Sequence, residues 1–523
     1  MGTTTPASQA APPQPSTPAS TTSEATMTPT LGPDLEAAGG EKQPPASAPV
    51  APDAASADAF EVSFDGEDDP LCPFNLASWR KWLMVATLAI SCVCVTFTSS
   101  MTANTYPGLE AEFHIVEEVA ILSISLFVMG LGVGPLFLGP LSEFIGRQKV
   151  LLWSFTIFTL FNLPVAFANH IVLYHVFRFL TGFAGSSFLS VSGAAITDVF
   201  PNHKVGTPMM IFSGAPFLGP VVGPLVSGFI VQNQPDWRWV SYTQLIWAAV
   251  MTVLLWVVIP EGYHPVVLAR KATALRKSTG DERYYAPIER ANRSFAREVA
   301  KSCKTPFILL ASQPMVLFLD IWSAIVLGVM YLFFGGIPFV FRTQYNFNVQ
   351  STGMAFLGIG IGQVCSALTQ PLFNKRYARR AAKLGAPPPP EDRLYAGKYG
   401  AVLCPLGVLL FGLTCFKSVH WIVPIIMTSL FGWGVGYSFT SVFTYLVDAY
   451  RPVAASALAS NSFVRSAFAA VFPLFGQQMY RKLGPVGGTC LLAGALALCL
   501  PFPFIFARIG ARIRANSKFA NPI

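Results

Sequence analysis

Runs of apolar residues separated by short polar turns dominate the chain from about residue 80 onward. Most runs are about 20 residues long, which is the length that an α-helix needs to cross the ~30 Å apolar core of a bilayer. The alternating segments typical of a membrane barrel are absent from the sequence. The pattern therefore predicts an all-α integral membrane protein with twelve transmembrane helices, at 82–104, 119–140, 149–168, 171–196, 207–231, 241–259, 315–341, 352–373, 399–416, 420–446, 456–479 and 485–507.

Polar segments divide this series of helices. Residues 1–75 are rich in Pro, Ser, Thr and Ala and cannot bury enough apolar surface to offset their ordering entropy, so we expect a disordered cytosolic tail. The remaining chain is predicted to contain an N-terminal six-helix half at 76–260, a cytosolic central loop at 261–312, a C-terminal six-helix half at 313–510 and a cytosolic tail at 511–523.

Composition supports the membrane assignment. Charged residues make up 12% of the chain and hydrophobic residues 52%, whereas an ordinary soluble domain carries about 25% charged residues. A chain this apolar needs lipid as its solvent. The nine cysteines follow neither a zinc-binding nor a disulfide pattern.

The basic residues predict the orientation. With the N-terminus in the cytosol, most Lys and Arg outside the apolar runs fall in cytosolic segments, including the cluster at 270–304. Both termini are therefore expected in the cytosol, and the sequon at Asn292 should stay unglycosylated. Because topology explains the net charge of +8, we expect no nucleic-acid partner.

The two halves of the chain echo each other. The spacing Gly130-x-Gly132-x-Gly134 recurs as Gly358-x-Gly360-x-Gly362, and on the same offset Arg147 corresponds to Lys375. Such echoes predict two six-helix halves repeated in parallel, with a substrate site between them at mid-membrane. The glycines could instead serve only close helix packing.

A short charged turn between the second and third predicted helices is the first candidate site. Gly139 and Gly146 permit tight backbone geometry. We expect Glu143 near the N-terminus of the third helix, where negative charge is favoured. Arg147 and Lys149 should hold the turn at the cytosolic face.

Ionisable residues inside predicted spans form the second set of candidates, because burying charge in a membrane is costly and is usually functional. Arg178 and His175 share one helical face, and Arg465 lies in the eleventh span. We expect Arg178 to act in proton coupling or substrate binding and Arg465 in substrate or gate contacts. Both arginines could instead bond helix carbonyls or a neighbouring acid. The candidates for the proton path are His175, Glu143, Asp198 and Asp320.

Charge inside the spans also constrains the substrate. Arginines outnumber carboxylates there, and the first span carries polar but uncharged residues from Thr96 to Asn104. Because arginine presents a planar fork of donors to carboxylate or phosphate, we expect an anionic or neutral small molecule. A polyamine or other cation would require paired acids.

The fifth predicted span is interrupted by helix-breaking residues. Three prolines and three glycines fall within one apolar run, where they remove backbone hydrogen bonds and kink the helix. The six residues are Gly214, Pro216, Gly219, Pro220, Gly223 and Pro224. They serve either transport or helix packing alone.

These segments carry a family resemblance. The turn at 139–149 resembles the loop 2–3 signature of the major facilitator superfamily, although that signature normally has Asp and Arg where this chain has Glu143 and Phe144. The motif at 214–224 resembles the span-five signature of drug:proton antiporters in that superfamily. Across about 75–520 the chain resembles the fungal twelve-spanner drug:proton antiporter family.

The resemblance implies a major facilitator fold and a proton-coupled exporter of a small organic compound at the plasma membrane. The substrate would be a secondary metabolite, an organic acid or a xenobiotic, and the carrier a monomer that uses protons and no cofactor. An importer of a small nutrient and a polyamine or cation exporter remain alternatives. A membrane-embedded enzyme is disfavoured, because the six histidines are scattered along the chain.

Overall fold

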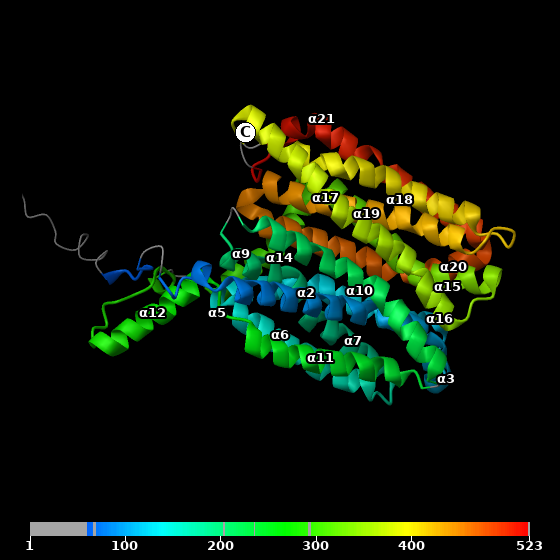
Figure 1. Ribbon diagram of the computed structural model, residues 1–523, viewed down its shortest axis with the longest axis horizontal. Coiled ribbons are helices and arrows are strands. Elements are labelled where there is room, and N and C mark those ends of the chain that lie inside the picture. The colour runs from blue at the N-terminus through cyan, green and yellow to red at the C-terminus, as the bar shows by residue number, and fades with distance from the viewer. Residues whose placement is uncertain are drawn as a thin grey trace, which may run out of the picture. The chain divides into compact units, whose positions relative to one another are not determined.

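The computed structural model describes residues 60–65, 69–201, 204–234, 236–290, 294–386 and 388–520. These residues are almost entirely helical, and the long helices run side by side (Figure 1). A first group contains α2 (Ser78–Ser100), α3 (Tyr106–Phe113), α4 (Glu117–Val133), α5 (Pro135–Ile145), α6 (Arg147–Ala166), α7 (Ile171–Gly185), α8 (Ser187–Ser190), α9 (Ser192–Val199), α10 (Gly206–Asn233) and α11 (Arg238–Val258).

A second group contains α15 (Pro314–Tyr345), α16 (Val349–Ala355), α17 (Leu357–Leu384), the 3-10 helix η4 (Pro390–Arg393), α18 (Leu394–Thr414), α19 (Ile422–Ala449), α20 (Ala454–Cys499) and α21 (Pro501–Ala515). Between the groups lie α12 (His264–Thr279), α13 (Pro287–Arg290) and α14 (Phe295–Ser312). We call the end of the bundle near α12 the α12 end and the opposite one, near α3 and α16, the α3 end (Figure 1).

Local chemistry accounts for several helix boundaries. Pro314 and Pro501 begin α15 and α21, where a missing N–H costs nothing. Gly280 and Gly385 end α12 and α17 in left-handed conformations that side chains disfavour.

Ten helices of the described residues are long and apolar enough to cross a membrane, or eleven if the bent pair α3–α4 counts as one span. The difference from the predicted twelve arises at two breaks. The predicted second span is divided between α4 and α5 at Gly134. The last two predicted spans run together in Arg451–Ala515, where Gly484 (φ 72°, ψ 173°) interrupts the helical geometry of α20.

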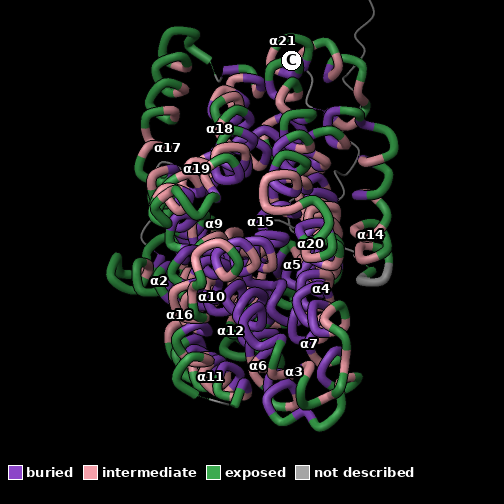
Figure 2. The backbone as a smooth tube through the Cα atoms, turned by 90° about the vertical axis from the view of Figure 1, so that its right-hand side faces the viewer, coloured by how far each residue is buried: buried purple, intermediate pink, exposed green. Residues whose placement is uncertain are grey.

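Buried residues lie where helices face one another, and exposed residues lie on the outer faces (Figure 2). Many of the exposed residues are large and apolar; Val257 on α11 is 79% exposed and Leu498 on α20 is 78% exposed. Such an outer surface suits contact with lipid.

The two glycine motifs make equivalent contacts. A Cβ atom at Gly130 would lie 2.3 Å from the carbonyl oxygen of Phe179, and one at Gly358 would lie 2.3 Å from that of Ile425. These glycines therefore let α4 approach α7 and α17 approach α19. The middle glycines, Gly132 and Gly360, instead face helices of the other group.

The first described residues fold onto the central segment. Val62 is buried against α12, and its N–H donates to the carbonyl oxygen of Tyr285 at 2.9 Å. Lys271 on α12 contacts the carboxylates of Asp65 at 2.7 Å and Asp69 at 2.9 Å. These contacts differ from the tail expected up to residue 75, because that expectation overlooked the apolar and acidic residues that match α12. The rest of the expected tail, 1–59, lies outside the described residues.

Candidate functional site

Arg178 on α7 is fully buried and joins three helices. Its Nε donates to the Ser123 carbonyl oxygen on α4 at 2.9 Å, and Nη1 donates to the Thr98 carbonyl oxygen on α2 at 3.0 Å. Nη2 lies 3.4 Å from the Thr102 hydroxyl, and the guanidinium lies 4.7 Å from the Phe127 ring centre. In the described conformation Arg178 therefore donates hydrogen bonds to helix carbonyl groups, which is the structural role considered as the alternative to transport. These bonds hold α7 against α2 and α4.

His175 lies one turn before Arg178 and is also buried. Neither of its ring nitrogens has a hydrogen-bond partner among the described residues, although its ring packs edge-on against Tyr174. Both residues lie in α7, three positions apart. No described carboxylate forms an ion pair with either of them.

Asp320 on α15 is buried and bonded to α20. Its two oxygens accept from the Ser460 hydroxyl at 2.8 Å and the Asn461 amide at 2.9 Å. Asn461 also donates to Ser323 at 2.7 Å. The carboxylate therefore has neutral donors and lies in the contact between two long helices.

Arg465 lies one turn after Asn461 on α20, in aromatic surroundings. Its guanidinium carbon is 5.3 Å from the centre of the Phe439 ring and 5.2 Å from that of Phe443. Its Nε has no hydrogen-bond partner in the described part of the chain. Phe439 also stacks on Phe217 of α10, with ring centres 4.9 Å apart. Arg465 thus supplies an unsatisfied buried donor where the two helix groups meet.

A pair of hydroxyl groups from α2 and α15 completes this region. The Ser99 hydroxyl on α2 lies 2.8 Å from the Tyr331 hydroxyl on α15, so this contact also joins the two groups. Sequence reasoning noticed the polar stretch around Ser99 but did not assign it a partner, because nothing in the local pattern points to a residue so distant in the chain.

The glycine and proline motif of α10 packs on the first helix. A Cβ at Gly219 would lie 2.0 Å from the Thr96 hydroxyl oxygen, and one at Gly223 would lie 2.0 Å from that of Ser100. The carbonyl oxygen of Pro224 accepts from the Asn104 amide at 2.9 Å. Close packing of α2 on α10 thus explains this part of the motif.

The remaining motif residues differ in their surroundings. Pro216 and Pro220 lie inside α10. A Cβ at Gly214 would meet nothing within 4 Å, so packing does not explain that glycine.

The charged turn at the α12 end gathers three segments around Arg147. Its Nε forms an ion pair with Asp198 on α9, and its guanidinium lies 4.9 Å from the Tyr263 ring centre. Nη1 also donates to the Ser142 hydroxyl at 3.3 Å, and the backbone N–H donates to the Glu261 carboxylate at 3.2 Å. Arg147 thereby connects α6 to α5, to α9 and to the segment after α11.

The other residues of the turn correct one expectation. Glu143 is exposed and lies in the last turn of α5, so its predicted place at the N-terminus of the third span is wrong. Glu261 fills that role instead. Gly146 has φ 99°, and a Cβ there would lie 2.3 Å from a Glu261 carboxylate oxygen, so glycine is required. Gly139 has open space around it, and Lys149 is exposed.

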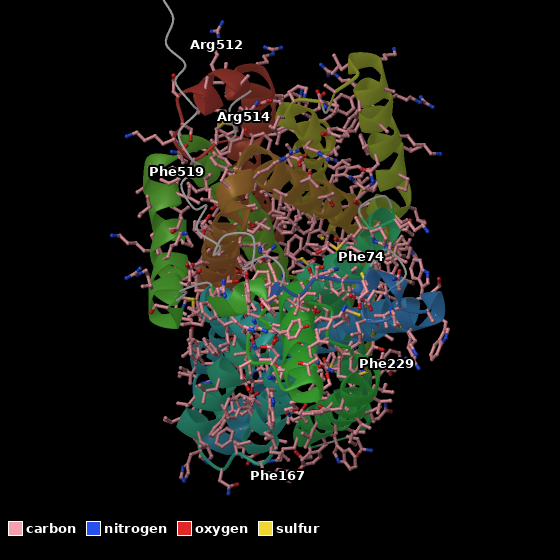
Figure 3. The ribbon with its side chains drawn as sticks, turned by 90° about the vertical axis from the view of Figure 1, so that its left-hand side faces the viewer. Phe74, Phe167, Phe229, Arg512, Arg514 and Phe519 are labelled. Atoms are coloured by element: carbon pink, nitrogen blue, oxygen red, sulfur yellow. The ribbon has the colours of Figure 1, made fainter. Side chains whose placement is uncertain are left out.

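A related ion pair occurs in the second group. Asp448 on α19 pairs with Arg393 of η4 at 2.7 Å, whereas Lys375, the residue on the Arg147 offset, is exposed. Nearby, Glu391 accepts two bonds from Arg514 of α21 at 2.8 and 3.0 Å. Figure 3 views the molecule from the α12 end and shows Arg514 at the end of α21.

The α3 end is joined across the groups. Arg481 on α20 pairs with Glu117 on α4 at 2.8 Å, and Gln478 donates to Glu118 at 2.9 Å. Each ion pair described above for the α12 end stays within one group or joins the first group to the central segment. The described conformation is therefore tied across the groups by ionic contacts at its α3 end.

Comparison with known proteins identifies relatives over most of the chain. Residues 88–473 match the profile of the Major Facilitator Superfamily. The chain is 43% identical over 467 residues to a protein named efflux pump atB from Aspergillus terreus, covering 88% of this chain and 90% of that one. It is 40% identical over 466 residues to the probable drug/proton antiporter YHK8 of Saccharomyces cerevisiae, with 88% and 90% covered. The crystal structure of a D-xylose-proton symporter matches with a TM-score of 0.60 and 15% identity, over 81% of this chain and 97% of that one, which shows a shared fold.

Proposed function

The chain belongs to the major facilitator superfamily of membrane transporters, and from that premise we propose that it is a proton-coupled exporter of a small organic compound. The family and the helical membrane fold, both predicted from the sequence, are confirmed. The observation that carries the proposed direction is the 43% identity to a protein named an efflux pump over 88% of this chain. The antiporter-like motif of α10 supports it.

The proposed site for the compound lies between the two helix groups. It is bounded by Arg465, Phe439 and Phe217, and by the hydroxyl pair of Ser99 and Tyr331. The unsatisfied Nε of Arg465 favours an anionic or neutral acceptor, and the rings favour an aromatic or amphipathic body. A polyamine would require a second acid beside Asp320.

Asp320 is the proposed proton-binding group. Its carboxylate is buried and accepts hydrogen bonds only from neutral donors. Arg465 lies one turn after Asn461 on the same side of α20, and its positive charge attracts the Asp320 carboxylate. Binding of a proton would cancel the attraction between Asp320 and Arg465 and loosen the contact of α15 with α20. Charge in the substrate region and helix packing would then change together.

The proposed orientation places the α12 end in the cytosol of the host cell, at the plasma membrane, with both termini inside. The carrier would be closed to the outside in the described conformation, because Glu117 and Arg481 join the groups at the α3 end. Turning of one group against the other would expose the site alternately to the two sides.

Deletion of the coding sequence in the host, followed by untargeted mass spectrometry of medium and cells, tests the function. A compound that disappears from the medium and accumulates in cells supports export. Complementation with the wild-type chain should restore secretion, whereas an Arg465→Ala variant expressed at the same level should not. A compound depleted from cells and retained in the medium would show import instead.

A further inference from the structure

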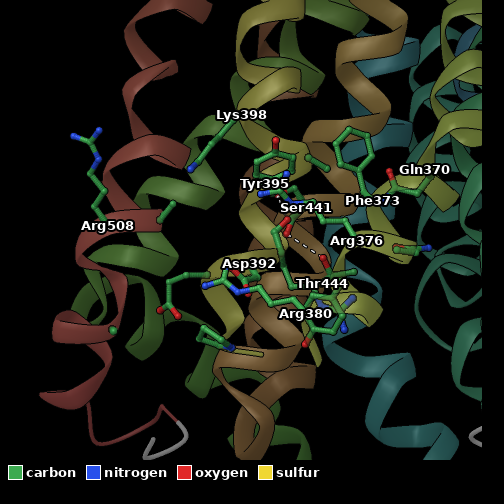
Figure 4. Close-up of a pocket in the computed structure, with 18 residues that line it drawn as sticks. Gln370, Phe373, Arg376, Arg380, Asp392, Tyr395, Lys398, Ser441, Thr444 and Arg508 are labelled. Atoms are coloured by element: carbon green, nitrogen blue, oxygen red, sulfur yellow. Dashed lines mark hydrogen bonds and ion pairs between the residues drawn. The ribbon is translucent and has the colours of Figure 1, made fainter. Parts of the chain in front are cut away.

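A second site lies away from the contact between the groups. A pocket of about 380 Å³ opens at the α12 end of the second group, lined by residues of α17, η4, α18, α19 and α21 (Figure 4). None of its lining residues was singled out by the sequence as a site. The pocket belongs to one helix group and shares no residue with the proposed transport site.

Cations dominate the lining of this pocket. Five basic side chains and two carboxylates line it, namely Arg376, Arg380, Arg393, Lys398, Arg508, Glu391 and Asp392. Such an excess of positive charge in a concave site favours an anionic ligand.

The carboxylates of the lining are already engaged. Asp392 pairs with Arg380 at 2.6 Å, and Glu391 is held by Arg514 from outside the lining. Arg393 is likewise held by Asp448. In the described part of the chain, the three remaining cations, Arg376, Lys398 and Arg508, make no ion pair.

Arg376 is positioned by an aromatic ring so that its guanidinium can donate hydrogen bonds to a ligand. Its guanidinium carbon lies 3.5 Å from the centre of the Tyr395 ring, so the planar fork rests on an aromatic face. Lys398 is one turn after Tyr395 on α18 and extends toward α21 (Figure 4). Arg508 lies on the outer side of α21, and its guanidinium points away from the other labelled pocket residues (Figure 4). A fork and an ammonium from different helices suit the several oxygens of a phosphoryl group.

The surroundings favour a lipid as the carrier of that group. Next to Arg508, α21 exposes Phe504, Ile505 and Ile509. This pairs an apolar outer face with a basic pocket at one end of the transmembrane helices. Basic pockets between helices on the cytosolic side are suited to anionic lipid head groups.

We propose that this pocket binds the phosphorylated head group of an anionic membrane lipid through Arg376 and Lys398. The bound lipid would bridge α17 and α18 beside α21, at the end of the second group that the proposed orientation places in the cytosol. This inference goes beyond the transport function, and its test does not require the transported compound to be known.

The test measures lipid binding to the purified full-length protein by native mass spectrometry. The probe is phosphatidylinositol 4-phosphate, with phosphatidylcholine as the uncharged reference and soluble inositol trisphosphate as the free-phosphate arm. The variant is Arg376→Gln/Lys398→Gln. The matched control is Lys375→Gln/Arg379→Gln, which removes the same charge from exposed positions of α17 outside the pocket.

The pocket variant should bind the phosphoinositide about 30-fold more weakly, since each basic residue near an anionic surface contributes ~1 kcal/mol. The control should bind like wild type, and equal melting temperatures would show that both variants are folded. Equal weakening in the control would overturn the site, because general surface charge would then explain binding. Inositol trisphosphate binding as tightly as the lipid would overturn the lipid as the source of the phosphoryl group.

Discussion

Gly353 on α16 offers a sharp test of how the two groups meet at the α3 end. A Cβ at this residue would lie 2.5 Å from the carbonyl oxygen of Pro224 on α10, and 3.3 Å from its carbonyl carbon. The same oxygen accepts from Asn104, so it is held from the other side. We therefore expect Gly353→Ala to force α16 and α10 apart.

The size of the effect follows from the geometry. Ordinary contact needs about 3.4 Å, so the two helices must separate by roughly 1 Å, and overpacking of this kind costs about 1–3 kcal/mol. The gain of about 0.5–1 kcal/mol from replacing helical glycine by alanine is the same in every conformation in which α16 stays helical, so it does not offset this cost. The described conformation should thus lose about 1–3 kcal/mol relative to conformations open at the α3 end, which raises their population about 5–150-fold.

Spin labels at Val116→Cys and Lys482→Cys, both exposed and next to the Glu117–Arg481 pair, would report the opening as longer distances. The accessible native cysteines would first be replaced. Gly494→Ala is the control, because a Cβ there meets nothing within 4 Å. Unchanged distances in Gly353→Ala, with a melting temperature equal to the control, would refute the reasoning.

Three further predictions concern charged residues. Arg465→Ala should lower export of an anionic compound about 10–100-fold, because a charge-assisted hydrogen bond contributes about 1.5–3 kcal/mol. Arg465→Lys should restore part of the export. Equal export rates of wild type and Arg465→Ala in vesicles would contradict this role. Arg147→Ala should destabilise the fold by about 3 kcal/mol, the lower end for a buried ion pair, by leaving the mostly buried Asp198 without its cation. Adding Asp198→Asn should recover part of the melting temperature, and no recovery would show that the pair is not the cause. Hydrogen bonds from the Asp65 N–H, the Lys271 ammonium and the Leu71 N–H lower the pKa of Asp69 to about 2. Attachment of residues 60–65 and 69–75 should therefore be complete above pH 3.8 and lost as the pH falls through about 2, as measured by hydrogen exchange. Lys271→Ala should loosen these residues at neutral pH, and exchange identical to that of the wild type would exclude the contact.

The helices could be predicted from the sequence because each is specified by its own residues. Apolar runs of bilayer length gave their positions, and the repeated glycine spacing pointed to equivalent contacts that the structure shows at Gly130 and Gly358. The break at Gly134 was harder to foresee, because the predicted span 119–140 runs across it. The non-helical residue Gly484, by contrast, falls in the gap between the predicted spans 456–479 and 485–507.

Partners distant in the chain could not be predicted from spacing. Asp198 and Asp448 are each the next-to-last residue of a helix, α9 and α19, yet their cations, Arg147 and Arg393, are not separated by the same number of residues as the two acids. Helix α6 begins directly at Arg147, so the acid that accepts from its N-terminus comes from Glu261 after α11 and not from Glu143. These pairings depend on how helices converge, which a single sequence does not encode locally.

The middle glycines of the two motifs have a geometric consequence. A Cβ at Gly132 would lie 2.5 Å from Ser466 Cβ, and one at Gly360 would lie 2.8 Å from Val221 Cγ1, so each marks a point where one group touches the other. Two such points define a line. A rigid body that turns about this line preserves both contacts while its two ends move in opposite directions. The two glycines would therefore hold the axis of rotation in place. A larger residue at either one would tilt this axis instead of favouring the opening of the bundle at one end.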